Sequence, residues 1–275
     1  MRSSARLNFV ASIVVAMFSQ VSIAAPDWSK IPKRDIHVFH AGVTPIEWTT
    51  KKSDHSGAAG MRKGESCVGC HEEKGALNFN FKRLADKELE PKGAPKTMSY
   101  PVGVQAAYDK DAIYIRLSFK APSGGGDKGD KENEVKAALM LADAKVPQAA
   151  QYGCWQTCHA DVRTMPGADE KKTKYSKEGT YELMQWRSAK GAKAVDGSVT
   201  NERRMDGGVA GVKAEGVKSG DAYTVTFVRK NPGDGKSVPF GIAIHADNSH
   251  GRFHHVSLGY TLGIGVDGDI KATKQ

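Results

Sequence analysis

The 275-residue sequence lacks the short motifs by which many enzyme classes are identified. It has no G-x-S-x-G nucleophile elbow, no glycine-rich phosphate loop and no H-E-x-x-H zinc helix. Beyond residue 24 it has no apolar run long enough to cross a bilayer. The sequence therefore gives no sign of a nucleotide-dependent enzyme, a zinc hydrolase or an integral membrane protein, and no set of catalytic residues stands out.

Cysteine is scarce as well, since the chain has only four. The first two, Cys67 and Cys70, are separated by two residues and followed at once by His71. This C-x-x-C-H pattern is the signature of c-type haem attachment. Each thiol can form a thioether with one vinyl group of the haem, and the histidine then becomes the proximal ligand of the iron.

The other two cysteines, Cys154 and Cys158, have three residues between them and precede His159. This C-x-x-x-C-H spacing is a rarer variant of the same motif. Two disulfide bonds are the alternative use of four cysteines in an exported chain. A disulfide gives no reason for a histidine directly after each pair, so we expect two covalently bound haem c groups, each with one iron.

The first 24 residues have the features of a secretory signal peptide. Arg2 and Arg6 make the start positive, residues 9–17 are apolar, and Ser22 and Ala24 fit the small-x-small rule for cleavage. The apolar run is short for a membrane span, and a retained anchor is the alternative interpretation. We expect an exported, soluble protein of the periplasm, a location that also suits covalent haem attachment.

Positive charge is in excess, and the formal net charge is +9 at pH 7. A basic surface favours acidic partners and can speed their transient docking. For an exported haem protein we expect other redox proteins, such as a quinol-oxidising cytochrome or a terminal reductase, and not nucleic acid. The simpler alternative is that the lysines only keep the surface soluble.

Most of the apolar pattern is typical of β-strands. Alternating or apolar stretches between turn residues predict strands at 36–40, 102–108, 113–119, 135–141, 223–229, 238–246 and 253–264. Residues 175–190 look partly helical, with Leu183 and Trp186 on one face, whereas residues 191–220 show little pattern.

Three stretches of the second half resemble the haem-binding domain of ethylbenzene-dehydrogenase-type γ subunits, which belong to the DMSO-reductase type of enzyme. They are Ala-Ala-Tyr-Asp and Ile-Tyr-Ile-Arg-Leu within residues 104–119, the segment 152–159, and the segment 240–265. The same domain occurs in periplasmic multihaem cytochromes, including some of the NapC/NirT-associated kind. The resemblance extends from about residue 100 to the C-terminus.

This resemblance implies a mainly β fold, an antiparallel β-sandwich with short helices and one haem at its edge. Residues 54–58 and 64–71 resemble the haem segment that precedes this domain in such cytochromes. We therefore expect a signal peptide (1–24), an irregular N-terminal haem segment (25–98) and a β-sandwich domain (99–275). The γ subunits hold a non-covalent haem b, so their axial ligands are not transferred to a chain that carries Cys154 and Cys158.

The sixth ligand of the first iron is expected to be His55. It lies in a glycine-flanked loop 12 residues before Cys67, and such a loop can fold over the haem. His40 and Met61 are the alternatives, and a surface role for His55 is the simplest one. Other methionines that could bind an iron are Met98, Met140 and Met165.

A cluster of histidines near the C-terminus offers ligands for the second iron. Neighbouring residues of a strand point to opposite faces, so only one of His254 and His255 can enter a given pocket. We rank His255 first, His254 second and His245 third, with His250 as the remaining member of the cluster. The alternative is that these side chains contact haem propionates or solvent.

The sequence thus predicts a periplasmic dihaem c-type cytochrome, an electron carrier and not an enzyme. It would transfer single electrons between redox proteins of a respiratory chain. Two histidines on each iron would give a lower potential than His/Met ligation and would close the iron to small molecules. The alternatives are a haem enzyme with one open iron, and a haem-binding subunit or sensor that docks to a molybdenum oxidoreductase.

Overall fold

The computed structural model describes residues 25–42, 55–73, 76–82, 95–120, 122, 135–146, 148–159, 178–246 and 254–275. The proposed signal peptide and His250 lie outside these residues. The protein is mainly β, as predicted. Its helices are short: η1 (Trp28–Lys30), α2 (Ala58–Arg62), α3 (Cys67–His71) and α5 (Ala149–His159). No helix in the described ranges is long and apolar enough to cross a membrane.

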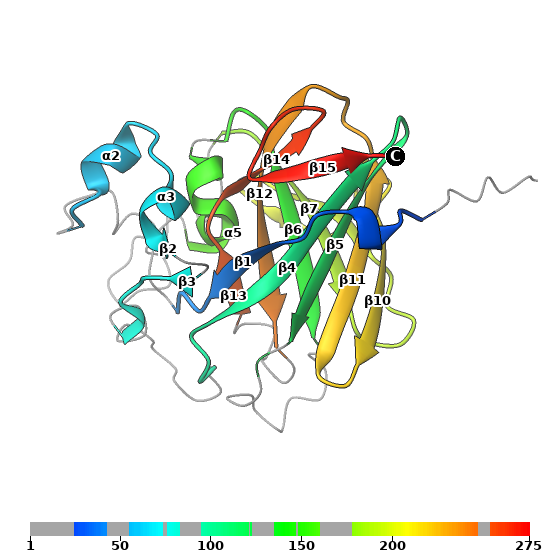
Figure 1. The fold of residues 1–275 in the computed structure, drawn as a ribbon, viewed down its shortest axis with the longest axis horizontal. Helices are drawn as coiled ribbons and strands as arrows, with labels where there is room; N and C mark the ends of the chain where they lie inside the picture. Colours follow the sequence, from blue (N-terminus) through cyan, green and yellow to red (C-terminus); the bar gives the residue numbers. More distant parts are fainter. Residues whose placement is uncertain are drawn as a thin grey trace, which may run out of the picture.

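The described strands, labelled in Figure 1 except for β8 and β9, are β1 (Arg34–Phe39), β2 (Glu72–Glu73), β3 (Ala76–Leu77), β4 (Ser99–Tyr108), β5 (Ala112–Lys120), β6 (Lys136–Ala142), β7 (Tyr181–Arg187), β8 (Val195–Val199), β9 (Arg203–Arg204), β10 (Lys213–Ser219), β11 (Ala222–Lys230), β12 (Lys236–His245), β13 (His254–Ser257), β14 (Tyr260–Ile264) and β15 (Ile270–Lys274).

Apart from the small β2–β3 pair, these strands form one large sheet. Its main order is β10-β11-β5-β4-β1-β13-β12-β6-β7-β8-β9, and β14 and β15 pair at its side. Most pairs are antiparallel, but β15 runs parallel to both β14 and β4. Strand β1 comes from the N-terminal segment and lies between β4 and β13, so this segment is part of the sheet.

The sheet folds back on itself, so that β7 packs against β10 and β11. The rings of Trp186 in β7 and Tyr223 in β11 have centroids 6.0 Å apart. Gly216 in β10 leaves room for the Trp186 ring, because a side chain at that position would collide with the indole. Apolar residues fill the space between the layers, among them Leu117, Leu139 and Ile242.

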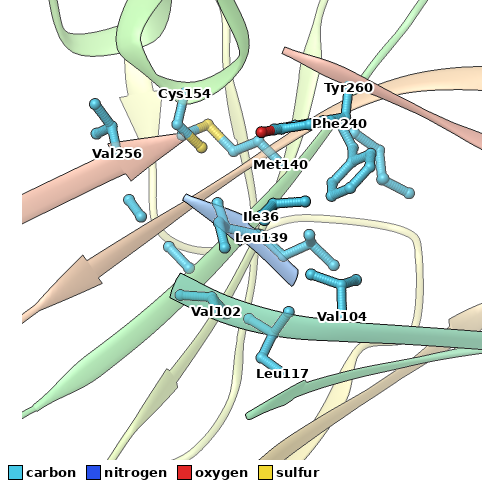
Figure 2. Packing of buried hydrophobic residues seen from close by; sticks show 14 of the residues in the cluster. Ile36, Val102, Val104, Leu117, Leu139, Met140, Cys154, Phe240, Val256 and Tyr260 are labelled. Atoms are coloured by element: carbon cyan, nitrogen blue, oxygen red, sulfur yellow. The ribbon is translucent and has the colours of Figure 1, made fainter. Parts of the chain in front are cut away.

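Helix α5 covers part of the other face of the sheet, and α2, α3 and α5 lie at one side of the molecule in Figure 1. Helix α5 lies against β12 and β13, and glycines make this close approach possible. Gly153 has a φ of 51°, and a Cβ there would lie 2.5 Å from the carbonyl oxygen of Leu258. Figure 2 shows Cys154 of α5 in one buried cluster with Met140 and Val256.

Several sequence-based strand predictions are confirmed. The predicted hairpin 102–119 is formed by β4 and β5, and the predicted strands at 36–40, 135–141, 223–229 and 238–246 are β1, β6, β11 and β12. The predicted strand 253–264 is interrupted at Leu258 and Gly259, which separate β13 from β14.

Two predictions for the middle of the chain are wrong. Residues 181–187 form strand β7 and not a helix, so Leu183 and Trp186, three residues apart, point to opposite faces. Pairing with β6 and β8 outweighs the helix propensity of residues such as Leu183 and Met184. The region 191–220 is also more regular than predicted, because it contains β8, β9 and β10.

Candidate haem-binding site

Helix α3 contains the whole first motif. On a helix, residues three and four positions apart share one face, so Cys67, Cys70 and His71 are brought to the same side. The helix ends at Glu72, where the backbone becomes extended. The Glu72 carboxylate accepts hydrogen bonds from Arg34 of β1 and from the Tyr260 hydroxyl of β14, each at 3.3 Å. The end of the motif is thereby fixed to the sheet.

The start of the motif is fixed to α5. The buried side-chain amide of Gln151 donates hydrogen bonds to the carbonyl oxygens of Met61 and Glu65, which belong to α2 and to the link between α2 and α3. Both helices of the N-terminal segment are therefore held against the helix that carries the second motif.

A cavity of about 560 Å³ opens between these elements. A volume of this order is typical of cofactor sites. Cys67, Cys70, His71 and His55 lie on its wall, together with the apolar side chains of Met61, Phe79, Tyr152, Trp155 and Leu258. Two thiols, two imidazoles and an apolar lining are the groups that a covalently attached haem requires, so the residues of this cavity fit that cofactor.

The rings of His55 and His71 face one another in this cavity. Their centroids are 5.9 Å apart and their planes are inclined by 23°. Imidazole nitrogens bind a transition metal at about 2 Å, so two rings on opposite sides of one metal need nitrogen atoms about 4 Å apart. The ring centres of His55 and His71 are farther apart than this, so the cavity leaves room for a metal ion between the two imidazoles.

The environment of Cys67 also suits a thioether. Its side chain is buried, and burial, followed by the nearby Cys70, raises the pKa of the Cys67 thiol to about 12. A thiolate would be costly at this position, whereas a thioether has no charge to desolvate. Cys70 is exposed, so the attachment edge of the cavity is open to solvent.

Two further residues contact His71, and neither of them belongs to a recognised haem motif. Asn78 places its side-chain oxygen 2.9 Å from Nδ1 of His71. The Phe79 ring lies edge-on to the His71 ring, with centroids 4.6 Å apart. Both follow the two-stranded β2–β3 turn, which brings them back beside α3. Only the folded turn shows this contact.

The second motif lies in α5, where Gly153 produces a kink. Cys154 is fully buried in the packed cluster of Figure 2 and is not on the wall of the 560 Å³ cavity. Attachment at Cys154 would therefore require its neighbours to rearrange. The neighbouring Trp155, in contrast, lies on the wall of the first cavity. The side chains of Cys158 and His159 lie outside the described part of the chain.

The C-terminal histidines are divided between the two faces of the sheet. His254 shares a face with Val256, which clusters with Cys154, and stacks on His245 with ring centroids 4.9 Å apart. His255 points to the opposite face. It is fully buried, its Nε2 lies 2.7 Å from the carbonyl oxygen of Thr97, and burial lowers its pKa to about 3.

His40 and Tyr100 share the face of His255. Their ring centroids lie 5.9 Å and 4.8 Å from that of His255. Of the three ranked histidines, His254 and His245 are thus on the side of α5, and His255 is on the other side.

These features define a mainly β protein of the c-type cytochrome class, with its best-formed site between α2, α3 and α5. Comparison with known proteins agrees. The family model described as ethylbenzene dehydrogenase matches residues 25–238. The chain is 51% identical over 255 residues to cytochrome c-551 of Rhodocyclus tenuis, covering 91% of this chain and all of the relative.

A second relative, cytochrome c-552 of Stutzerimonas stutzeri, is 43% identical over 293 aligned residues, covering both proteins in full. The chain therefore belongs to the family that contains these two cytochromes c and that the ethylbenzene dehydrogenase model describes.

Proposed function

We propose that the protein is a dihaem c-type cytochrome of the periplasm that carries single electrons between redox proteins of a respiratory chain. The observation that carries the proposal is the cavity on which Cys67 and Cys70 lie and across which His55 and His71 face one another. Its relatives are named as cytochromes c, which supports electron transfer as the activity.

At the first site, Cys67 and Cys70 would tether the cofactor, and His71 and His55 would bind its iron from the two sides. When bound, haem supplies a one-electron Fe(III)/Fe(II) couple. The apolar wall of Tyr152, Trp155 and Leu258 keeps water from one side. If His55 and His71 both bind the iron, they would leave no position on it for a small substrate, and this favours a carrier over an enzyme.

The second attachment, at Cys154 and Cys158 with His159 as proximal ligand, rests on the sequence motif. His254 and His245 lie on the face that α5 covers, so they suit its sixth position better than the first-ranked His255, which points into the sheet interior. Export to the periplasm rests on the signal-like residues 1–24.

The test uses the full-length protein matured in a periplasm. Mass spectrometry of the denatured chain counts covalent haems, and low-temperature EPR of the oxidised form reports their spin states. Two haems with only low-spin signals support the proposal. One haem would show that the second motif is not an attachment site, and a high-spin signal would show an open iron and favour an enzyme.

The resemblance to γ subunits of ethylbenzene-dehydrogenase-type enzymes, with which the name of the family model agrees, suggests one further candidate, a haem-binding subunit that docks to a molybdenum oxidoreductase. It predicts stable co-purification of this protein with a molybdenum enzyme from its native source. Recovery of the dihaem protein alone at low ionic strength would count against it.

A further inference from the structure

Asn78 makes three hydrogen bonds to the last two residues of the first motif. Its backbone N–H donates to the carbonyl oxygen of His71 at 2.9 Å. Its side-chain Oδ1 lies 2.9 Å from Nδ1 of His71, and its Nδ2 donates to the carbonyl oxygen of Cys70 at 3.5 Å. Asn78 lies outside the motif, seven residues after the histidine, and it also lines the cavity.

These contacts fix the orientation of the amide. A carbonyl oxygen accepts hydrogen bonds and cannot donate, so the group facing the Cys70 carbonyl must be the NH₂ of Asn78. The amide oxygen then faces His71, and an oxygen can only accept there. With the amide in this orientation, Nδ1 of His71 is the nitrogen that donates to Asn78, and Nε2 is the nitrogen left to bind a metal.

The turn that presents Asn78 is held in place from several sides. Glu72 and Leu77 pair in the β2–β3 ladder, and Leu77 is buried in the main core. Phe79, the next residue, packs its ring against His71. Rotation of the imidazole would break the Asn78 bond and this ring contact together, so the histidine is held in one orientation.

We propose that Asn78 is the positioning residue of the first haem site, which fixes the His71 tautomer and lowers the reduction potential of that site. The proposal rests on haem attachment at the first motif. An acceptor at Nδ1–H increases the electron density of the ring and its basicity as a ligand. A more basic ligand stabilises the ferric state over the ferrous state, so the hydrogen bond between His71 and Asn78 lowers the reduction potential.

The side chain of Asn78 is exposed, and this limits the size of the effect. Water can replace part of the hydrogen bond when the amide is removed. We therefore expect Asn78→Leu to weaken the preference for the oxidised state by up to about tenfold, an upward shift of up to 59 mV for a one-electron couple. Asn78→Asp should act in the opposite direction, because a carboxylate is a stronger acceptor.

The experiment is a potentiometric titration of the purified holoprotein in both variants, with haem content checked by mass. Only one of the two titration steps should move, upward for Asn78→Leu and downward for Asn78→Asp. Asn231→Leu is the matched structural control, because Asn231 likewise makes side-chain hydrogen bonds, three in number, between β11 and β12. It should lower stability and leave both potentials unchanged.

A second control separates the hydrogen bond from the added charge of aspartate. Asn80 lies on the same cavity wall, so Asn80→Asp places a carboxylate nearby without the contact to His71. The downward shift should be larger for Asn78→Asp than for Asn80→Asp. Equal shifts in these two variants, or an unchanged potential in both Asn78 variants, would overturn the proposal.

The outcomes also separate this inference from the proposed function. Wild-type protein without haem at the first motif would refute the function itself. Haem present with unmoved potentials would refute only the role of Asn78. If Asn78→Leu does not fold, the comparison of Asn78→Asp with Asn80→Asp still decides, since the aspartate is nearly isosteric with the native side chain.

Discussion

At the scale of single residues, the main feature is the pair of imidazoles on the first cavity. His71 comes from a rigid helix, whereas His55 comes from the loop before α2. The 5.9 Å between their ring centres is set by two separate elements, and Gln151 helps to hold these together by tying the intervening chain to α5. The spin state of the site therefore reports directly on this geometry.

We predict that His55→Ala converts one haem of the oxidised protein from low spin to high spin. Without the imidazole, the sixth position of the iron would be empty or bound by water. Either case gives a weaker ligand field than imidazole, and a weaker ligand field favours the high-spin state. EPR and binding of carbon monoxide to the reduced form measure the change. His37→Ala is the matched control, because His37 is a half-buried histidine of β1 outside this cavity. Unchanged low-spin signals in His55→Ala would assign the sixth ligand to another residue, such as Met61.

The sequence predicted this site only in part. The spacing of Cys67, Cys70 and His71 allowed the motif and its ligand to be predicted, because the attachment chemistry acts within one helical turn. His55 could be chosen only among alternatives, and Asn78 gave no signal. Asn78 reaches His71 because the β2–β3 pair brings the chain back beside α3 and Leu77 is buried in the main core. The local sequence pattern does not show this pairing.

At the scale of elements, the docking of α5 on the sheet depends on Gly153. Its φ of 51° and ψ of −133° are strained for any residue with a side chain. There is also no room for a Cβ at this position, because a Cβ on residue 153 would lie 2.5 Å from the carbonyl oxygen of Leu258. The kink thus combines a backbone requirement with a steric one.

We predict that Gly153→Ala lowers the free energy of unfolding by about 3 kcal/mol, from backbone strain and displacement of α5. Gly191→Ala separates the two causes, because Gly191 also has a positive φ but has no atom within 4 Å of its Cβ position. This control should cost only about 1 kcal/mol. Denaturant unfolding measures both values, and equal losses would show that close packing of α5 contributes nothing.

The wrong helix prediction for residues 181–187 has a physical cause. Strands with an alternating apolar pattern, such as β5 and β11, were predictable because each shows its own period of two. Strand β7 is rich in residues that favour helices, and it is a strand because β6 and β8 provide its hydrogen bonds. Its neighbours in space, and not its own composition, decide its structure.

At the scale of the whole molecule, the resemblance predicted the β-sandwich, but the strand order was not predictable. The insertion of β1 between β4 and β13 joins the first haem segment to the sheet. This pairing has a consequence for the two motifs. It places Phe39, the last residue of β1, between them.

A continuous chain of aromatic contacts connects His71 of the first motif to Trp155 of the second motif. The His71 and Phe79 rings have centroids 4.6 Å apart, and Phe79 contacts Phe39 at 5.0 Å. Phe39 in turn lies edge-on to Trp155, the residue after Cys154, at 5.4 Å. Core packing accounts for these rings, and a rigid, gap-free path between two haems would also favour electron exchange.

If the protein carries a haem at each motif, as proposed, we predict that Phe39→Leu slows electron exchange between them several-fold. Among the described aromatic pairs, Phe39 is the only ring that contacts both Phe79 and Trp155. Leucine has no ring and is smaller, so the substitution leaves a gap in the path. Pulse radiolysis of the oxidised protein measures the rate at which the electron redistributes after one haem has been reduced.

Phe227→Leu is the matched control, since Phe227 is as deeply buried as Phe39 but lies in β11, outside this chain. Both substitutions should lower the free energy of unfolding by a similar amount, about 1–2 kcal/mol. If the path matters, only Phe39→Leu slows the exchange. If both variants keep the wild-type rate at equal loss of stability, the rings serve packing alone and the path plays no part in electron exchange.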